Sequence, residues 1–267
     1  MKKYLCAPLV LLLVFTIGCS GDDNQNNGSS NPVADNPTNF LDIGASANDL
    51  LSNTNFDALV IEVAYVSGFR PTNETMTNFE DYIRERTFKQ NIEIVYRELP
   101  SPNEETLTLQ EISDLEIENR TIYNDGTTIA VYIYFADAAS ETDDEDEGLV
   151  TLGAVYRNTS MVIYEQTVQI LEGLSPTISI TDVETATLNH EFGHLLGLVN
   201  LGTPLTNAHE DPEAEGHCDI DGCLMQAELE FGGAMMRLLE SRTSKGLVAI
   251  PVLDAECILD LQNNGGR

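Results

Sequence analysis

Hydrophobic positions along the chain alternate between strand-like and helix-like spacing. Continuous or alternating apolar residues, many of them β-branched or aromatic, predict strands at 59–66, 92–99 and 128–136. Apolar residues that recur every three or four positions predict helices at 75–88 and 109–122. Because strands and helices follow one another in this order, we expect an α/β (α+β) fold with a small mixed, mainly parallel twisted sheet.

The pattern then changes to a hairpin and to helices alone. Residues 149–156 and 160–164 predict the two strands of a hairpin. The preceding run, 141–147, is almost wholly acidic and is expected to be a solvated loop. Helical spacing at 228–239 and 253–261 predicts a small C-terminal helical subdomain.

A further helix is predicted between these two parts of the chain. Thr181 and Glu184 match a capping box, in which the first side chain caps the helix and the second reaches back to it. Gly197 fits the left-handed turn that ends many helices. The segment between them is therefore expected to be helical, which matters for the motif that it contains.

This helix contains His190-Glu-Phe-Gly-His194, an HExxH motif. On a helix, residues four apart share a face, so the imidazoles of His190 and His194 can bind one zinc ion. Glu191 projects close to the metal, where its carboxylate can take a proton from a zinc-bound water. The motif predicts zinc as cofactor and Glu191 as the catalytic base.

The extended motif HExxHxxG, from His190 to Gly197, resembles the metzincin clan of zinc peptidases. A third histidine or an aspartate usually follows the glycine by three residues, but Asn200 stands there and is a poor zinc ligand. Further along, His217-Cys218 and Cys223-Leu224-Met225 form a pattern that closely resembles archaemetzincins. We therefore expect a metzincin-like fold built around an active-site helix.

The resemblance implies roles for residues beyond the helix. His217 corresponds to the third zinc ligand, and Met225 to the methionine of the turn beneath the metal. Residues 201–216 are then an insertion between Gly197 and the third ligand. His209, which lies inside this insertion, is the competing candidate for that ligand.

The cysteines set a further expectation. Archaemetzincins have a second, four-cysteine zinc site that uses a later CxxC pair, whereas only Cys257 follows Cys223 here. We therefore expect one zinc ion. In an exported protein Cys218 and Cys223 are close enough in sequence to form a disulfide, and a pairing with Cys257 remains open.

The N-terminus predicts export. Two lysines precede an apolar stretch at 5–17, and Thr16-Ile-Gly-Cys19 resembles the lipobox of bacterial lipoproteins. We expect a lipoprotein signal peptide at 1–18 and a lipid on Cys19. An ordinary secretory signal is the alternative. The lipid would anchor the protein to the outer membrane of a bacterial cell envelope, facing either the periplasm or the exterior.

Composition defines the remaining domains and partners. Residues 19–55 are rich in Asn, Ser, Asp, Gly and Pro and predict a flexible tether, followed by the zinc metallopeptidase domain at 56–267. Lys and Arg number 13 against 44 Asp and Glu, which gives a formal net charge of −31. Because phosphates would be repelled, nucleic acid is excluded as a partner.

The resemblance implies a zinc-dependent endopeptidase that takes a peptide or protein substrate. The strand near 152–156 would form the upper rim of the cleft and pair with an extended substrate. Asn200 and the insertion at 201–216 motivate an alternative: an inactive surface lipoprotein that uses the metalloprotease fold to bind peptides. In a third alternative the metal only stabilises the fold, with both His209 and His217 bound to it.

Overall fold

The computed structural model describes residues 31–144 and 149–267. The predicted signal peptide at 1–18 and the predicted lipid site, Cys19, lie outside the described residues. So does the last part of the predicted acidic loop. None of the helices in the described ranges is long and apolar enough to span a lipid bilayer.

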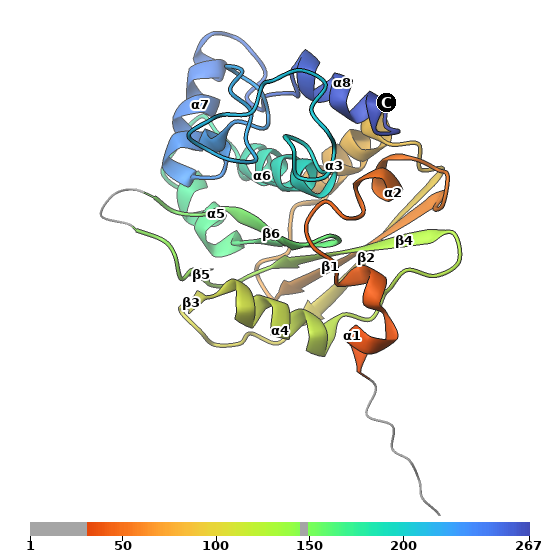
Figure 1. Ribbon diagram of the computed structural model, residues 1–267. Helices are drawn as coiled ribbons and strands as arrows, with labels where there is room; N and C mark the ends of the chain where they lie inside the picture. Colours follow the sequence, from red (N-terminus) through yellow and green to blue (C-terminus); the bar gives the residue numbers. More distant parts are fainter. Residues whose placement is uncertain (1–30, 145–148) are drawn as a thin grey trace, which may run out of the picture. The chain divides into compact units, whose positions relative to one another are not determined.

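A five-stranded sheet with the order β2-β1-β4-β7-β6 runs through the folded unit (Figure 1). Its strands are β1 (Ala58–Val66), β2 (Asn91–Leu99), β4 (Thr128–Phe135), β6 (Gly153–Arg157) and β7 (Ser160–Ile163). Neighbouring strands are parallel except β6, which pairs antiparallel with β7. A short second sheet pairs β3 (Thr106–Leu107) with β5 (Ala139–Ser140). The sheet confirms the predicted α/β fold class and the mainly parallel arrangement.

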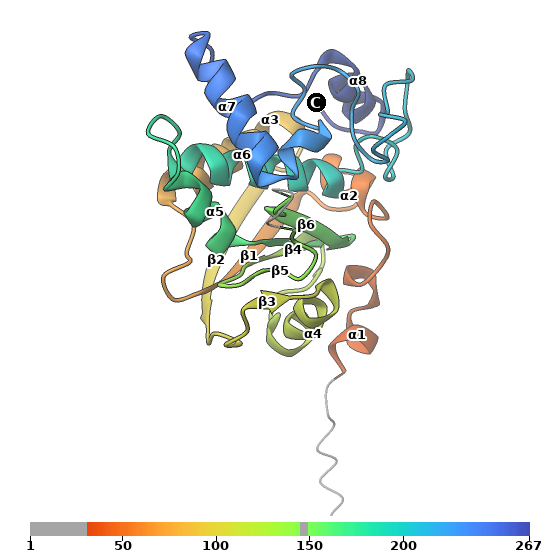
Figure 2. The ribbon, with the colours of Figure 1, turned by 90° about the vertical axis from the view of Figure 1, so that its left-hand side faces the viewer.

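Helices cover both faces of the five-stranded sheet. Helices α3 (Asn73–Arg86) and α6 (Ile180–Leu195) lie on one side, and α4 (Leu109–Asn119) lies on the other (Figures 1 and 2). The remaining longer helices are α5 (Glu165–Glu172), α7 (Gly232–Ser244) and α8 (Ala255–Asn263). Helix α5 was not predicted. The helix predicted at 228–239 is divided into a 3₁₀ turn, η2 (Ala227–Leu229), and α7.

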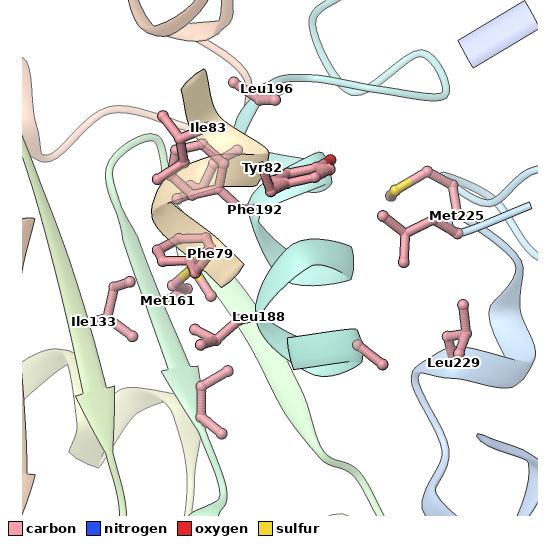
Figure 3. Packing of buried hydrophobic residues seen from close by; sticks show 14 of the residues in the cluster. Phe79, Tyr82, Ile83, Ile133, Met161, Leu188, Phe192, Leu196, Met225 and Leu229 are labelled. Atoms are coloured by element: carbon pink, nitrogen blue, oxygen red, sulfur yellow. The ribbon is translucent and has the colours of Figure 1, made fainter. Parts of the chain in front are cut away.

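Aromatic and aliphatic packing fixes α6 above the sheet. Phe79 of α3 and Phe192 of α6 meet edge to face, with ring centroids 5.2 Å apart (Figure 3). Leu188 of α6 and Met161 of β7 belong to the same buried cluster. Burying each such side chain stabilises the fold by about 1.5–3 kcal/mol. The helix that carries the HExxH motif is therefore held rigidly on both sides.

The predicted tether is wrong for residues 32–55, because the folded unit begins at Pro32. This segment forms α1 (Pro32–Asp35), η1 (Pro37–Asn39) and α2 (Ala47–Leu51). Leu50 and Leu51 are fully buried, and the amide of Asn39 donates to the carbonyl of Ala130 on β4. The average composition of the segment is polar, but a few well-placed apolar residues attach it to the domain.

The predicted start of α6 is also wrong, by two residues. Ser179 caps the helix, and its hydroxyl accepts from the backbone of Asp182 while the Asp182 carboxylate accepts from Ser179. Glu184, which was predicted to close the capping box, is buried and accepts hydrogen bonds from Thr72 and Thr75 at the start of α3. Glu184 thus joins two helices rather than capping its own.

Burial of two neighbouring carboxyl groups makes stability depend on pH. Burial, and secondarily the adjacent Glu184, raises the pKa of Glu165 from 4.5 to about 9. The folded state therefore keeps a proton that the unfolded chain releases near pH 4.5. The stability that this proton contributes is fully present below pH 4.5 and declines as the pH rises towards 9.

We expect Glu165→Gln to raise the free energy of unfolding by roughly 1–4 kcal/mol at pH 8 and by little at pH 4.5. Glutamine resembles the protonated carboxyl group, so it removes the cost of ionisation. Urea unfolding at both pH values measures the difference. Glu228→Gln, at an exposed position, is the control and should show no such pH dependence. Equal stabilities of wild type and Glu165→Gln at pH 8 would contradict the expectation.

Candidate metal centre

Three histidine rings converge at the C-terminal part of α6. His190 and His194 lie one turn apart on the helix, and His217 comes from the loop that follows the insertion. Their ring centroids are separated by 4.8, 5.4 and 5.1 Å, and one donor nitrogen of each lies within 4.8 Å of the others. All three are buried. The structure therefore groups His217, and not His209, with the motif histidines.

The orientation of the rings fits one shared metal ion. The Nε2 atoms of His190 and His194 are 3.2 Å apart. Two nitrogens bound to one tetrahedral zinc at ~2.0–2.1 Å are expected about 3.3 Å apart. His190 Nδ1 lies 2.8 Å from the carbonyl oxygen of Leu224, which can only accept, so the proton belongs on Nδ1 and the lone pair on Nε2.

His217 is oriented in the same way. Its Nδ1 lies 3.2 Å from the carbonyl oxygen of Glu215, which leaves its Nε2 as the acceptor. Among the described residues this buried Nε2 makes no hydrogen bond, and its nearest polar neighbour is the carboxylate of Glu230, 3.2 Å away, which when ionised can only accept. A buried nitrogen lone pair without a partner is costly in a protein interior, and a metal ion at the centre of the three rings would satisfy it.

Burial keeps the helix imidazoles uncharged. Desolvation lowers the pKa of His190 to about 4, against the opposing effect of its hydrogen bond to Leu224. Desolvation also places the pKa of His194 well below its ordinary value, and the neighbouring His190 and His217 act in the same direction. Neutral imidazole is the form that binds metal, so both rings are ready to bind at neutral pH.

Glu191 lies beside the three rings, between α6 and the edge strand β6. Its side chain is 2% exposed, and burial, with a smaller contribution from Glu230, raises its pKa well above the ordinary value. Gly153 of β6 makes room for it: a Cβ at that position would lie 2.6 Å from Glu191 Cγ. Sequence analysis did not identify Gly153, because its role depends on a contact across 38 residues.

A cavity of about 270 Å³ opens onto this site. Glu191, His194 and His217 line it together with Ala154 and Val155 of β6. All charged side chains that line it are acidic, and they include Glu215 and Glu230. The Glu230 carboxylate lies 3.2 Å from His217 Nε2. The cavity therefore combines three nitrogen donors, a buried carboxyl group and the edge of a sheet.

Met225 lies against the helix between the two motif histidines. A Cβ at Gly193 would overlap its sulfur, so the glycine of the motif permits this close approach. Gly197 has a φ of +74°, and the chain turns away from the helix there. Asn200 is exposed, and its amide donates to Glu210 rather than facing the three rings.

The predicted disulfide between Cys218 and Cys223 is wrong. Both thiols are free and buried, as is that of Cys257. Cys218 and Cys257 instead converge with Asp254 and His209, and the donor atoms of all four lie within 4.8 Å of one another. Hydrogen bonds from Cys218 and Cys257 lower the pKa of Cys223, beside this group, to about 5. Counting cysteines missed the group because two of its four donors are not cysteines.

Comparisons with known proteins give one likeness. No protein-family model and no curated protein matches the chain. Among solved structures, the crystal structure of an archaemetzincin from Methanopyrus kandleri is similar to it, with 15% sequence identity and a TM-score of 0.47. The likeness covers 79% of this chain and 96% of the archaemetzincin. At that identity and score the likeness assigns no function to this chain.

We expect His217→Ala to weaken zinc binding at this centre by more than the 10- to 100-fold that loss of an outer-shell contact typically costs, because a ligand is removed. Competition with a chromophoric chelator measures the affinity. Asn200→Ala is the matched control, since Asn200 lies on the same connection but faces away. Unchanged affinity in His217→Ala would exclude it as a ligand.

Proposed function

We propose that the protein is a zinc-dependent endopeptidase whose metal ligands are His190, His194 and His217. The observation that carries the proposal is the convergence of three buried imidazole nitrogens beside the buried carboxyl group of Glu191, in a cavity bordered by an edge strand. Three protein ligands with one open position are typical of catalytic zinc.

Glu191 is proposed as the general base and then the general acid. Zinc supplies a Lewis acid that polarises the peptide carbonyl and makes water more acidic. The Glu191 carboxylate accepts a proton from the attacking water and delivers it to the departing amine. A cation near Glu191 lowers the pKa of its carboxyl group and so opposes the rise that burial causes. The group is then ionised and available as a base.

The edge strand β6 is proposed to bind the substrate. It is the last strand of the sheet, so one edge of its backbone has no neighbouring strand within the described residues. An extended peptide can pair with that edge and thereby align its scissile bond with the metal centre. The acidic lining of the cavity favours peptides with basic side chains near that bond.

The N-terminal pattern supports a lipid-anchored protein of the bacterial cell envelope, with peptides or proteins there as substrates. The two alternatives to a peptidase receive less support. Asn200 motivated a non-catalytic binding module, but His217 supplies the third nitrogen. A closed centre that uses both His209 and His217 conflicts with the structure, which places them in different groups.

We expect Glu191→Gln to retain zinc and to lower kcat by roughly 10²–10⁴-fold, the usual contribution of general acid–base catalysis. Digestion of a peptide library with and without a chelator, followed by mass spectrometry, measures cleavage. Glu213→Gln, at an exposed loop position, is the control. Chelator-insensitive cleavage, or full turnover in Glu191→Gln, would refute the mechanism.

Gly153→Ala tests the placement of the base without changing any ligand. The added methyl group overlaps the Glu191 side chain, which must then move away from the centre. We expect kcat to fall at least about tenfold while zinc affinity stays unchanged, since misplacing a reacting group by ~1 Å is costly. Ala154→Gly, at the next position, is the control. Wild-type kcat in Gly153→Ala would show that this contact does not position Glu191.

A further inference from the structure

A second cavity, of about 410 Å³, lies between α3, α6 and the segment that joins α7 to α8. Helix α6 lines it with Thr185 and Asn189, which share a face because they are four residues apart. Helix α3 contributes residues from Asn78 to Arg86, and the joining segment contributes residues from Val248 to Leu253. None of its lining residues lines the cavity at the candidate metal centre. The fold therefore has room for a ligand outside the candidate active site.

Three polar groups in the wall of this cavity lack hydrogen-bond partners. The hydroxyl of Tyr82, Nε of Arg86 and Oδ1 of Asn189 are buried and make no hydrogen bond with any described residue. The side chains of Tyr82 and Asn189 are only 8% and 7% exposed. The Tyr82 hydroxyl points away from the rings of Phe79 and Phe192 (Figure 3). Buried polar groups without partners are rare and costly, so three in one wall indicate a ligand that completes their hydrogen bonds.

Much of the remaining wall is apolar, and part of it is exposed. Leu224 is buried, whereas Val248 and Val252 are 75% and 65% exposed. The exposed segment is nevertheless held in place, because the amide of Leu224 donates to the carbonyl of Val252 and Cys223 forms a β-bridge with Val252. Exposed apolar side chains in a fixed position beside a cavity are typical of a binding site for an apolar group.

The charged groups of the cavity have the cation inside and the carboxylates outside. The side chain of Arg86 is 17% exposed and that of Glu85 is 66% exposed, and their charged groups lie 3.4 Å apart. Asp81, one turn before Glu85 on α3, is also exposed. The arrangement suits a ligand with a negative group inside the cavity and a positive group at its rim.

Tyr82 and Arg86 form a pair of neighbouring donors. The guanidinium carbon of Arg86 lies 5.7 Å from the centre of the Tyr82 ring. Burial raises the pKa of Tyr82 above its ordinary value, so its hydroxyl keeps the proton and donates. Two donors, one of them cationic, match a carboxylate. The amide of Asn189 contains both a donor and an acceptor, and its oxygen matches a peptide N–H.

We propose that this cavity binds a short apolar peptide with free termini. The terminal carboxylate accepts from Tyr82 and Arg86, and a peptide N–H donates to the oxygen of Asn189. Apolar side chains of the peptide pack against Leu224 and Val252, and its amino terminus lies near the exposed carboxylates of α3. A peptide of two or three residues fills about 410 Å³ better than a single amino acid does. The proposal goes beyond the peptidase and does not rest on it, since the two cavities share no residue.

The cavity adjoins a candidate metal ligand without including it. Asn189 directly precedes His190 in the chain. The carbonyl of Leu224 accepts from His190 Nδ1, and the amide of Leu224 donates to Val252. Because the two cavities lie so close together, a binding experiment has to distinguish them.

Calorimetric titration of the zinc-loaded full chain with leucyl-leucine tests the proposal, with Glu191→Gln as the parent protein so that the probe is not cleaved. We expect saturable binding of one dipeptide per chain. Leucyl-leucinamide, which lacks the negative charge, should bind at least about tenfold more weakly. Equal affinities for the acid and the amide would overturn the proposal, and so would the absence of saturable binding or equally tight binding of free leucine.

Tyr82→Phe tests the donor to the carboxylate. It should weaken leucyl-leucine binding by about tenfold or more, because a hydrogen bond to a charged group is lost. It should leave the free energy of unfolding unchanged or higher, since the hydroxyl has no partner in the free protein, and urea unfolding therefore separates loss of binding from misfolding. Tyr96→Phe, outside the cavity, is the matched control. Unchanged affinity in Tyr82→Phe would overturn the proposed pose.

Two further variants establish which cavity the dipeptide occupies. Val252→Ser should weaken binding roughly threefold to tenfold through lost apolar contact, whereas Leu174→Ser, at an exposed position outside the cavity, should not. His217→Ala disrupts the candidate metal centre and should bind leucyl-leucine like the parent protein. Loss of binding in His217→Ala, with unchanged binding in Val252→Ser, would place the dipeptide at the metal centre and overturn the second site.

Discussion

The structure depends on the burial of polar side chains along one helix. All residues of α6 from Val183 to Leu195 are buried, although several are polar or titratable. A buried polar group needs a partner, and most of them have one within the fold. Glu184 accepts from the start of α3, Thr187 donates to the carbonyl of Val183, and His190 lies against the carbonyl of Leu224. The inward-facing imidazole nitrogens and the Glu191 carboxyl group are not satisfied by these contacts, and together they define the candidate site.

Two glycines allow other segments to approach this helix closely enough to form the site. Gly193 lets the sulfur of Met225 lie directly against α6, and Gly153 lets β6 lie directly against the Glu191 side chain. One contact supports the histidines, and the other positions the candidate base beside the strand proposed to bind substrate. Both contacts are closer than a methyl group at the glycine would allow, so each glycine lets a side chain lie directly against the backbone beside the candidate ligands and the candidate base.

The sequence alone was enough to predict the features that depend on the spacing of residues close together in the chain. The strands of the sheet, helices α3 and α4 and the pairing of His190 with His194 follow from periodicity over a few residues. Features that depend on distant contacts were missed or misassigned. Glu184 looked like a cap because Thr181 precedes it, but its partner lies on α3. Residues 32–55 looked like a tether because their average is polar, although Leu50 and Leu51 are buried. Pairing Cys218 with Cys223 considered thiols alone and ignored a histidine and an aspartate that only the fold brings close.

Polar groups must also supply much of the free energy that keeps the insertion at 201–216 in one conformation. Its two leucines, Leu201 and Leu205, are only partly buried, and the residues it buries are Thr203, His209 and Gly216. Ordering a loop costs about 1–2 kcal/mol of backbone entropy per residue, which so little apolar burial does not offset. Hydrogen bonds from Thr203 and to Asp260 supply part of the difference.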